Sequence, residues 1–453
     1  MKSPIRVGLL ALAVLAAEGN CFPLFAQNWN FDARKIALGG VGGSENLATA
    51  MIDEQREYRS IVLPFGLLQV LRDFDTFDPD SSNFDMVKAF EYAASPIHFV
   101  VGRDDSSRSG QTLFVNDIRN AELSRDLSRY RGFAPANDLR AEGLATPSFG
   151  GTFKLARGEH GSFQGIYVGA GPYLSARAIG AIDEGLTSVL ASGVNVPSAR
   201  FLIANTDQLQ AALAVTGGYR GRFAWPAGIG SGSDREGLYV AANYNYLRGF
   251  RYGDIDMAIT METDRTGLIS LTPTQPPIVI TTLDADRGTG FSLDAGAGAV
   301  VNNWEFGFGA RGIANRIDWS GLERKRYLLQ SLTSGDSDFQ ESGAVPAGDV
   351  RVELPVDYRA NLAYATDRWT AAAEVGHGLG GGSFHGGYEH RLGPAELRGG
   401  ARYTTTKWNP TGGVGVDLSR RVSLDFAAYG TTTNIERKRQ LALAVSMRFN
   451  GSR

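Results

Sequence analysis

Ser383 and His385 are the pair of residues in this 453-residue chain that most resembles a catalytic arrangement. Residues two apart on a β-strand share a face, so a serine nucleophile could lie beside a histidine base there. A lipid hydrolase built on a barrel would also need a polar orienting group, with all three on the outer wall. His390 is five residues from His385 and is expected on the opposite face. The remaining histidines are His98, His160 and His377. We expect exposed or lumenal histidines and no enzyme, with hydrolysis kept as a remote alternative.

Two acidic stretches offer the hard oxygen ligands that calcium prefers. The first stretch contains Asp73, Asp75, Asp78, Asp80 and Asp85, and the second contains Asp336, Asp338, Glu341 and Asp349. Neither has the spacing of an EF-hand, and solvated acidic loops have the same composition. Calcium binding therefore stays open, and we predict no catalytic, metal or cofactor site.

A run of glycines, Gly39-Gly40-Val41-Gly42-Gly43, could be mistaken for a phosphate-binding loop. It lacks the Lys-Ser/Thr pair of such a loop and does not follow a convincing buried strand. A formal net charge of -3 also argues against nucleic acid as a partner, because nucleic-acid-binding proteins usually carry a basic patch. We expect the glycines to serve close packing of the backbone.

The segment from Arg437 to Phe449 has the period-2 pattern of a β-strand. Apolar side chains take one face: Leu441, Leu443, Val445, Met447 and Phe449. Small and polar side chains take the other: Gln440, Ala442, Ala444, Ser446 and Arg448. The length suits a tilted membrane strand, which needs about 9–11 residues.

The same alternation repeats toward the N-terminus, with strands expected near 422–429, 414–418, 395–404, 369–375, 358–364, 304–320, 288–301, 238–255, 208–224, 161–178 and 147–157. Further apolar runs lie at 61–71, 97–101 and 112–118, and helix-like spacing at 47–51, 84–94 and 121–130. Short turns are expected at 302–303, 366–368, 392–394 and 419–421, and long loops near 179–206, 263–287, 332–350, 404–411 and 431–436. Short turns on the periplasmic side and long loops outside are typical of outer-membrane barrels.

We therefore predict an all-β fold, an antiparallel transmembrane β-barrel of about 14 strands, with 12 or 16 possible. A soluble sandwich would place the apolar face inward, but small Gly and Ala residues and aromatic side chains near strand ends favour lipid outside. The aromatic residues concerned are Trp304, Tyr364, Trp369, Tyr403 and Trp408.

Charged side chains fall opposite the apolar face, and we expect them to line the lumen. The candidates are Glu396, Arg398, Arg402, Asp417, Asp425 and Arg448. The cations could pair with the carboxylates on neighbouring strands, because charges in a low-dielectric wall need partners. Two roles follow, a structural one that holds wall and plug together, which we favour, and a polar lining that selects solutes.

The N-terminus predicts export to the outer membrane of a Gram-negative bacterium. Lys2 and Arg6 precede an apolar run at 7–17, and Ala26 ends a small-residue cleavage site, as in a secretory signal peptide. Eleven apolar residues are too few to span a bilayer. Cleavage after Ala26 would remove Cys21, the single cysteine, and with it any disulfide; the residues before Cys21 fit a lipoprotein signal poorly. We divide the chain into a signal at 1–26, an N-terminal plug with the first strands and short helices at 27–146, and the main barrel at 147–453.

The stretch Ala33-Arg34-Lys35-Ile36-Ala37-Leu38-Gly39-Gly40-Val41 resembles the Ala-Arg-x-x-Ala-Met-Gly-Gly start of FadL-related outer-membrane proteins. That group includes long-chain fatty-acid and hydrocarbon transporters and PorV- and TraF-like barrels, and the C-terminal hairpins from Trp408 to Phe449 are similar to theirs. The resemblance implies a barrel of about 14 strands with an N-terminal segment inside it, so that Gly39, Gly40, Gly42 and Gly43 would belong to a plug. The Asn-Pro-Ala element that usually follows in the transporters is missing between Glu45 and Arg59.

We expect a FadL-like channel for hydrophobic or small amphipathic solutes, with lipid, the barrel-assembly machinery and a hydrophobic small molecule as partners. Five phenylalanines in the first third could line a greasy pocket: Phe65, Phe74, Phe77, Phe84 and Phe90. The alternative is a PorV- or TraF-like barrel that binds a partner protein and transports nothing.

Overall fold

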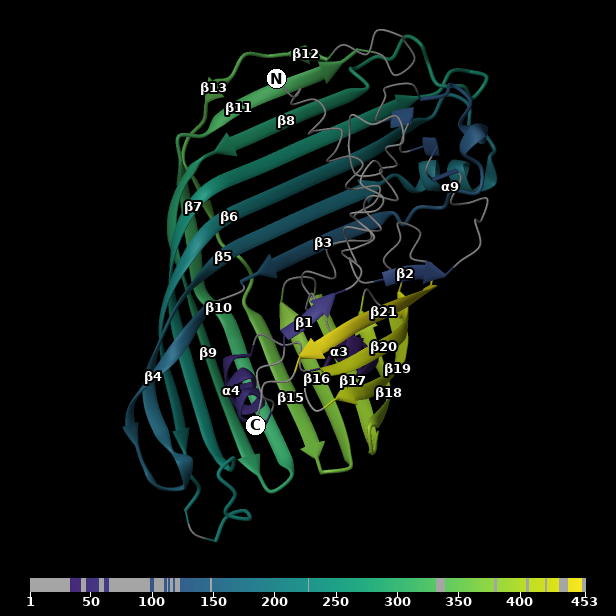
Figure 1. Ribbon diagram of the computed structural model, residues 1–453. Helices are drawn as coiled ribbons and strands as arrows, with labels where there is room; N and C mark the ends of the chain where they lie inside the picture. The colour runs from purple at the N-terminus through teal and green to yellow at the C-terminus, as the bar shows by residue number, and fades with distance from the viewer. Residues whose placement is uncertain are drawn as a thin grey trace.

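A computed structural model shows an all-β protein whose antiparallel strands form one continuous sheet that curves into a barrel (Figure 1). The residues it describes are 33–41, 46–56, 61–64, 98–101, parts of 110–118, and 123–449 with gaps at 147–148, 227, 331–338, 379–380, 405–406, 420–421 and 432–438. The fold class predicted from the alternating pattern is confirmed. No helix in the described part of the chain is long and apolar enough to cross a membrane.

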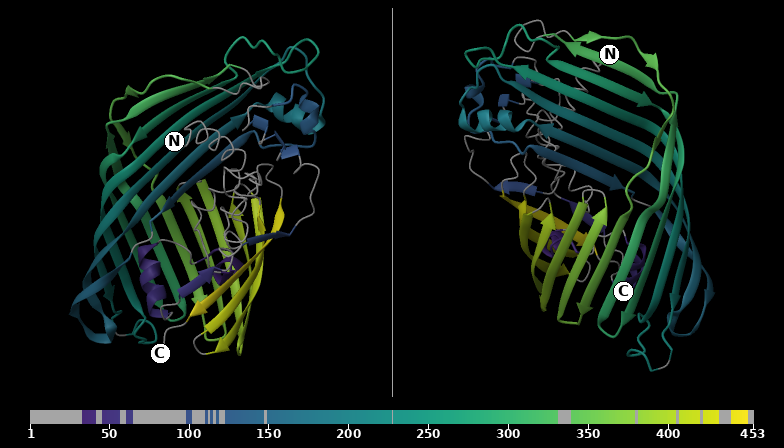
Figure 2. Two further views of the ribbon diagram at one scale, coloured as in Figure 1. Left: turned by 45° about the horizontal axis from the view of Figure 1, so that its top comes forward. Right: turned by 180° about the vertical axis from the view of Figure 1, so that it is seen from behind.

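The wall has a tall side and a short side (Figure 2). The tall side consists of β5 (Phe163–Ile182), β6 (Arg200–Phe223), β7 (Gly237–Glu262), β9 (Arg287–Val301) and β10 (Trp304–Ser320). The short side consists of β15 (Asp357–Ala365), β16 (Trp369–Gly378), β17 (Gly381–Leu392), β18 (Ala395–Thr404), β19 (Lys407–Ser419), β20 (Val422–Thr431) and β21 (Gln440–Phe449).

Several strands are divided, so the sheet contains 21 segments in the part of the chain that the structure describes. The shorter segments are β1 (Ile61–Pro64), β2 (His98–Val101), β3 (Asp138–Ala145), β4 (Phe149–Arg157), β8 (Ile278–Ala285), β11 (Glu323–Leu329), β12 (Gln340–Glu341), β13 (Val345–Pro346) and β14 (Val350–Val352). β1 and β2 pair with the two halves of β21, and β3 and β4 with the two halves of β5. Two short segments that pair with different halves of the same edge of a strand together count as one strand of the barrel. The expected number of about 14 barrel strands stays a prediction.

The helical elements with complete bounds are α3 (Ala33–Ala37), α4 (Leu47–Arg56), α9 (Glu184–Ser192) and the 3-10 turns η1 (Leu127–Tyr130) and η2 (Glu159–Gly161). The predicted helix at 47–51 is confirmed. The helix expected at 121–130 is limited to η1, and the apolar run at 112–118 is helical, not a strand, where it is described. The helix expected at 84–94 lies outside the described residues.

The turns expected at 302–303, 366–368 and 392–394 all join consecutive strands at the same end of the barrel (Figure 1). Long connections lie at 183–199 and 263–277, within the loops expected at 179–206 and 263–287, but they are shorter than predicted because β6 begins at Arg200 and β8 at Ile278. The loop expected at 404–411 is wrong, because β19 begins at Lys407. The tall strands are longer than the length of about 9–11 residues expected of a membrane strand, because they continue beyond the apolar band.

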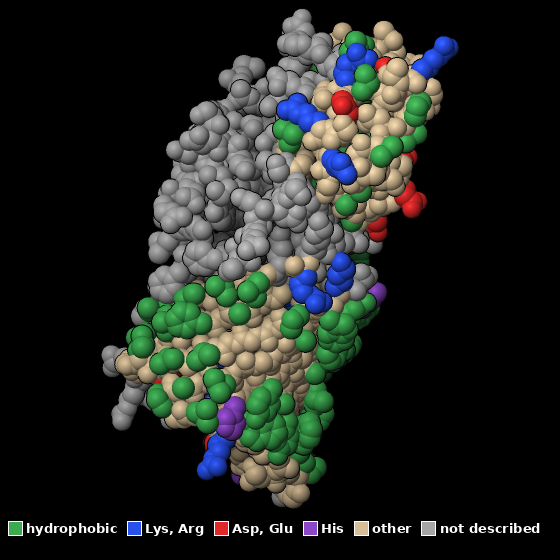
Figure 3. Space-filling model, turned by 90° about the vertical axis from the view of Figure 1, so that its right-hand side faces the viewer, with side chains coloured by type: hydrophobic (Ala, Val, Ile, Leu, Met, Phe, Trp, Pro, Cys, Tyr) green, Lys and Arg blue, Asp and Glu red, His purple; other side chains and the backbone are tan. Residues whose placement is uncertain are grey.

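The burial pattern of the wall is inverted relative to a soluble protein. On β21, Leu441 and Leu443 are exposed, while Ala444 and Ser446 on the alternate face are buried. Large apolar side chains are exposed on many other strands, among them Phe308 and Phe426, and Figure 3 shows hydrophobic side chains gathered over the lower half of one face. Exposed apolar area of this extent is stable only against another apolar medium, which identifies the outward face as the lipid-facing side of a transmembrane barrel.

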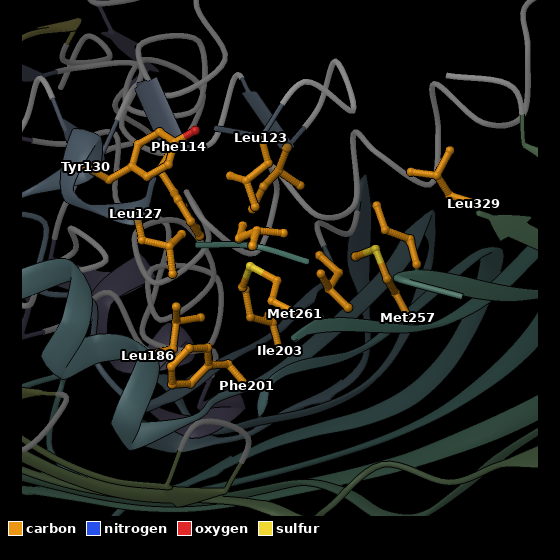
Figure 4. Close-up of a cluster of buried hydrophobic side chains, with 14 of the residues drawn as sticks. Phe114, Leu123, Leu127, Tyr130, Leu186, Phe201, Ile203, Met257, Met261 and Leu329 are labelled. Carbon is orange, nitrogen blue, oxygen red and sulfur yellow. The ribbon is translucent and has the colours of Figure 1, made fainter. Parts of the chain in front are cut away.

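The outward face stays apolar above this band, where protein covers it. β6 pairs with β5 without interruption from Arg222 to Ile203, so Ile203 and Phe201 lie on the same face as the exposed Val215. Unlike Val215, both are buried, in a cluster that includes Leu186 of α9 and Tyr130 of η1 (Figure 4). Segments from the first 133 residues therefore replace lipid as the apolar cover of the tall strands.

Aromatic side chains mark the short-turn end of the apolar band. The rings of Trp304, Tyr364, Trp369 and Tyr388 form a continuous row across four neighbouring strands, with centroid separations of 4.8, 5.0 and 5.9 Å. Trp and Tyr are enriched at membrane–water interfaces because their rings are apolar and carry a polar group. This row therefore marks one membrane interface.

If the apolar band faces lipid, Phe308→Lys should lower the free energy of unfolding in a bilayer. Phe308 is 53% exposed on the outward face of β10, and a lysine near the bilayer midplane of a barrel costs about 2–4 kcal/mol. Urea-induced unfolding in lipid vesicles would measure the loss. The control Ala191→Lys, on the exposed surface of α9, should change the free energy of unfolding by less than about 0.5 kcal/mol. Equal effects of the two substitutions would contradict the assignment of the band.

Candidate functional site

The N-terminal helices α3 and α4, with the residues next to them (33–41 and 46–56, here called the inner segment), lie on the concave side of the wall (Figure 1). The wall residues that touch the inner segment belong to the buried faces of their strands. Ala427 and Ala444 pack with Ala33 of α3, and Val300 packs with Ile52 of α4. The inner segment therefore occupies the lumenal side, opposite the apolar band.

Hydrogen bonds attach the inner segment to four strands. The backbone N–H of Ala33 donates to Ser446 Oγ (2.9 Å), and Thr411 Oγ1 donates to the carbonyl of Ala37 (2.9 Å). His385 Nδ1 lies 2.7 Å from the carbonyl oxygen of Gly39, so this ring nitrogen carries the proton and donates it. On α4, Thr49 Oγ1 donates to Asn361 Oδ1 (2.7 Å).

Glycines of the wall let the inner segment approach closely. A Cβ at Gly400 would lie 2.6 Å from the carbonyl oxygen of Gly386 and 2.7 Å from the Gly39 nitrogen. A Cβ at Gly309 would lie 2.8 Å from the side chain of Asn46, whose Oδ1 accepts the N–H of Ala48 at the start of α4. Contacts under 3.0 Å cannot be accommodated without a shift, so any larger residue there would displace the helices.

Gly39 and Gly40, predicted to belong to a plug, lie in this inner segment just after α3. Both adopt positive φ (76° and 88°), which glycine reaches without strain, and they turn the chain along the wall. The other two predicted plug residues, Gly42 and Gly43, lie outside the described residues.

A buried ionic network connects α3 with β17, β18, β20 and β21. Its centre is Glu389, whose side chain is fully buried and accepts from Arg34 Nε (2.9 Å) and Arg398 Nε (2.9 Å). Arg398 also donates to Asp425 (2.7 Å) and Glu396. Four guanidinium groups (Arg34, Arg391, Arg398, Arg448) meet three carboxylates (Glu389, Glu396, Asp425).

The structure brings together four of the six predicted lumenal residues: Glu396, Arg398, Asp425 and Arg448. The other two, Arg402 and Asp417, lie outside this network. The guanidinium of Arg402 lies over the ring of Tyr429 (5.2 Å), and the exposed Asp417 accepts a hydrogen bond from Ser423 Oγ (2.6 Å). Glu389 and Arg34 were missed, although Glu389 shares the polar face of its strand with His385 and Arg34 lies in the N-terminal motif.

A second polar group lies on β10, β15 and β16, next to a residue of β15 that contacts the inner segment. Arg311 of β10 binds Asp357 (3.1 Å), and Arg359 of β15 binds both Asp357 (3.2 Å) and Glu374 of β16 (3.2 Å). Asn361, two residues beyond Arg359, accepts from both Asn46 and Thr49 of the inner segment. Both ends of the inner segment are therefore fixed by polar contacts to the wall.

The hydrolase alternative is not supported by the geometry. Glu374 pairs with His385 in the sheet register, and His385 is 1% exposed, on the lumenal face that contacts Gly39. Ser383 shares that face, so neither group lies on the outer wall, where a lipid hydrolase would need them. Among the described residues, no group of three or more His, Cys, Asp or Glu side chains is placed to hold a metal ion.

The other predicted sites are only partly covered by the structure. His390 lies on the outward face beside Tyr388 (ring centroids 6.3 Å), opposite His385 as expected. In the second acidic stretch Glu341 and Asp349 are exposed, and Glu341 lies 3.9 Å from Lys325. The acidic residues at 73–85, Asp336, Asp338, the side chain of His98 and the five phenylalanines of the first third lie outside what the structure describes.

A cavity of about 380 Å³ lies between α4 and the tall side of the wall. Leu47 and Met51 of α4 line one side, and Arg220 and Asn243 of β6 and β7 line the other. The volume is at the lower end of the range of about 300–1,000 Å³ that holds small-molecule ligands. None of these four residues was singled out from the sequence.

No protein-family model matches the chain, and no curated protein sequence matches it. Among solved structures, the toluene transporter TodX of Pseudomonas putida is similar with 14% identity over 73% of this chain and 93% of that one, at a TM-score of 0.30. Outer membrane phospholipase A of Escherichia coli shares 11% identity over 54% of this chain and 79% of that one, at a TM-score of 0.23. A mutant porin of Rh. blastica shares 8% identity over 54% of this chain and its own whole length, at a TM-score of 0.21. Scores this low carry no argument about function.

The network predicts that Glu389→Gln loosens the inner segment. The change removes the charge that three arginines bind directly, and removing one partner of a buried ion pair costs about 3–5 kcal/mol. We expect faster amide hydrogen exchange at residues 33–41 and a free energy of unfolding lower by about 3 kcal/mol. Asp417→Asn is the matched control, because this carboxylate lies outside the network. Unchanged exchange at 33–41 in Glu389→Gln would show that the network does not hold α3.

Proposed function

We propose that this protein is an outer-membrane channel for small amphipathic solutes, whose lumen is restricted by the inner segment. The observation that carries the proposal is the cavity enclosed between α4 and the lumenal face of a wall whose other face is exposed and apolar. A lipid-facing wall with an internal cavity provides a protected route through a membrane. The lumenal face supplies polar groups along that route.

The inner segment is suited to restrict passage because polar contacts hold it in place. Ion pairs in a low-dielectric interior are strong when they are complete and costly when one partner is lost. A solute can pass only if the inner segment shifts, or through the space beside it. The amphipathic class follows from the cavity lining, in which Leu47 and Met51 face Arg220 and Asn243.

The resemblance of the N-terminal motif to FadL-related proteins agrees with this proposal, and so does the signal sequence. The PorV- or TraF-like alternative, a barrel that binds a partner protein and transports nothing, requires no internal cavity. Flux measurements separate the two functions directly.

Flux through the barrel should rise when the inner segment is released. We expect purified protein in liposomes to pass small amphipathic solutes slowly, and Arg34→Gln to pass them several-fold faster, because α3 loses its ion pair with Glu389. Solute efflux from loaded vesicles measures the rate. Arg251→Gln serves as control, because its partners Asp284 and Asp286 lie outside the lumen on exposed positions.

The absence of flux in both the parent protein and Arg34→Gln would contradict a channel. Recovery of a stoichiometric partner from native membranes, together with absent flux, would favour the scaffold alternative.

A further inference from the structure

The cavity beside α4 has a cationic end. Arg220 is 6% exposed, and its Nη1 donates to Asn243 Oδ1 (2.8 Å) and to the carbonyl of Tyr219 (2.9 Å). Its guanidinium lies 4.5 Å from the ring of Tyr167. Lys154 of β4 lies nearby, with Nζ 4.6 Å from the ring of Phe163. Two cations thus lie against aromatic rings at one end of the cavity.

The one carboxylate of the lining, that of Asp294, is hydrogen-bonded to groups of the wall. Asp294 accepts from Asn245 Nδ2 (2.7 Å) and from the backbone N–H of Gly312 (2.8 Å). Arg311, a third cation of the lining, is bound to Asp357 (3.1 Å). Because Arg311 is neutralised by Asp357, the remaining charges of the lining are Lys154, Arg220 and the single carboxylate of Asp294, an excess of one positive charge that favours an anion.

The middle of the cavity is lined by neutral hydrogen-bonding groups. Thr216 donates to Asn245 Oδ1 (2.7 Å), and both line the cavity together with Ser292 and Asn243. A hydrocarbon in this position would leave polar groups of the wall without water or a partner, which is costly. A solute that carries hydroxyl groups can replace that water.

We propose that this cavity binds a small hydroxylated aromatic carboxylate, with its carboxylate between Lys154 and Arg220 and its ring against Tyr167. Arginine and lysine recognise carboxylates by charge-assisted hydrogen bonds. The aromatic side chains and the apolar face of α4 provide contact surfaces for a flat ring. The inference deepens the proposed function, on which it rests, by naming the solute class and its binding residues.

Binding of 4-hydroxybenzoate to the purified full-length protein in detergent tests the proposal. We expect saturable binding that weakens at least tenfold in Arg220→Gln and in Lys154→Gln, while Arg251→Gln binds like the parent protein. Toluene, which has a ring without charge, and decanoate, which has a carboxylate on an alkyl chain, should bind at least tenfold more weakly than 4-hydroxybenzoate. Lys154 is exposed on β4, so its variant gives a result even where Arg220→Gln does not fold.

Equal binding of 4-hydroxybenzoate to the parent protein and Lys154→Gln would overturn the site. Equal or tighter binding of toluene or decanoate would overturn the solute class. Vesicle efflux separates this proposal from the channel proposal. Binding that depends on Lys154 without any efflux supports the site and removes the channel, whereas efflux that neither substitution changes supports the channel and removes the site.

Discussion

A charge inside a lipid-facing wall must have a partner, and the buried carboxylate of Glu389 shows how this protein meets that requirement. Its side chain is inaccessible to water and is neutralised by Arg398 from the adjacent strand and by Arg34 from the N-terminal helix α3. Arg34 and Glu389 are separated by 355 residues. The need to neutralise Glu389 therefore connects the N-terminal helix α3 to β17, in the C-terminal part of the chain. The position of the inner segment thus depends on electrostatics as well as on packing.

The shape of the wall follows the same division between its two faces. Large apolar side chains point outward toward lipid, and many of the inward-facing residues that contact α3 and α4 are glycine or alanine. Gly400 and Gly309 allow backbone contacts that a single Cβ would prevent. The 57 glycines of the chain, which would weaken most soluble folds, are therefore understandable in a barrel that packs an inner segment against its wall.

Alternation alone was sufficient to predict the faces of most strands, because a period of two assigns every side chain to one side. The structure joins Arg398, Asp425 and Arg448, which the alternation assigned to one face, in the buried network with α3. Alternation could not predict which of these residues meet, because pairing depends on register and on height along the strand, and so Arg402 and Asp417 were grouped with a network they do not join. Glu389 and the cavity lining depend on contacts between distant segments, which no local pattern reveals.

The cavity lining contains two environments, and they are the reason for proposing an amphipathic solute. Arg220 lies at the polar end of the cavity, whereas Tyr173 at its other end belongs to an apolar cluster with Tyr252 and Trp319. The indole N–H of Trp319 donates to Gln210 (3.0 Å), and the buried rings of Trp319 and Tyr252 pack in one cluster with Tyr173, which lines the cavity. In the channel that we propose, a purely polar solute would be disfavoured beside Tyr173, and a purely apolar one beside Arg220 and the neutral hydrogen-bonding groups. A molecule with one face of each kind would meet a partner at both positions.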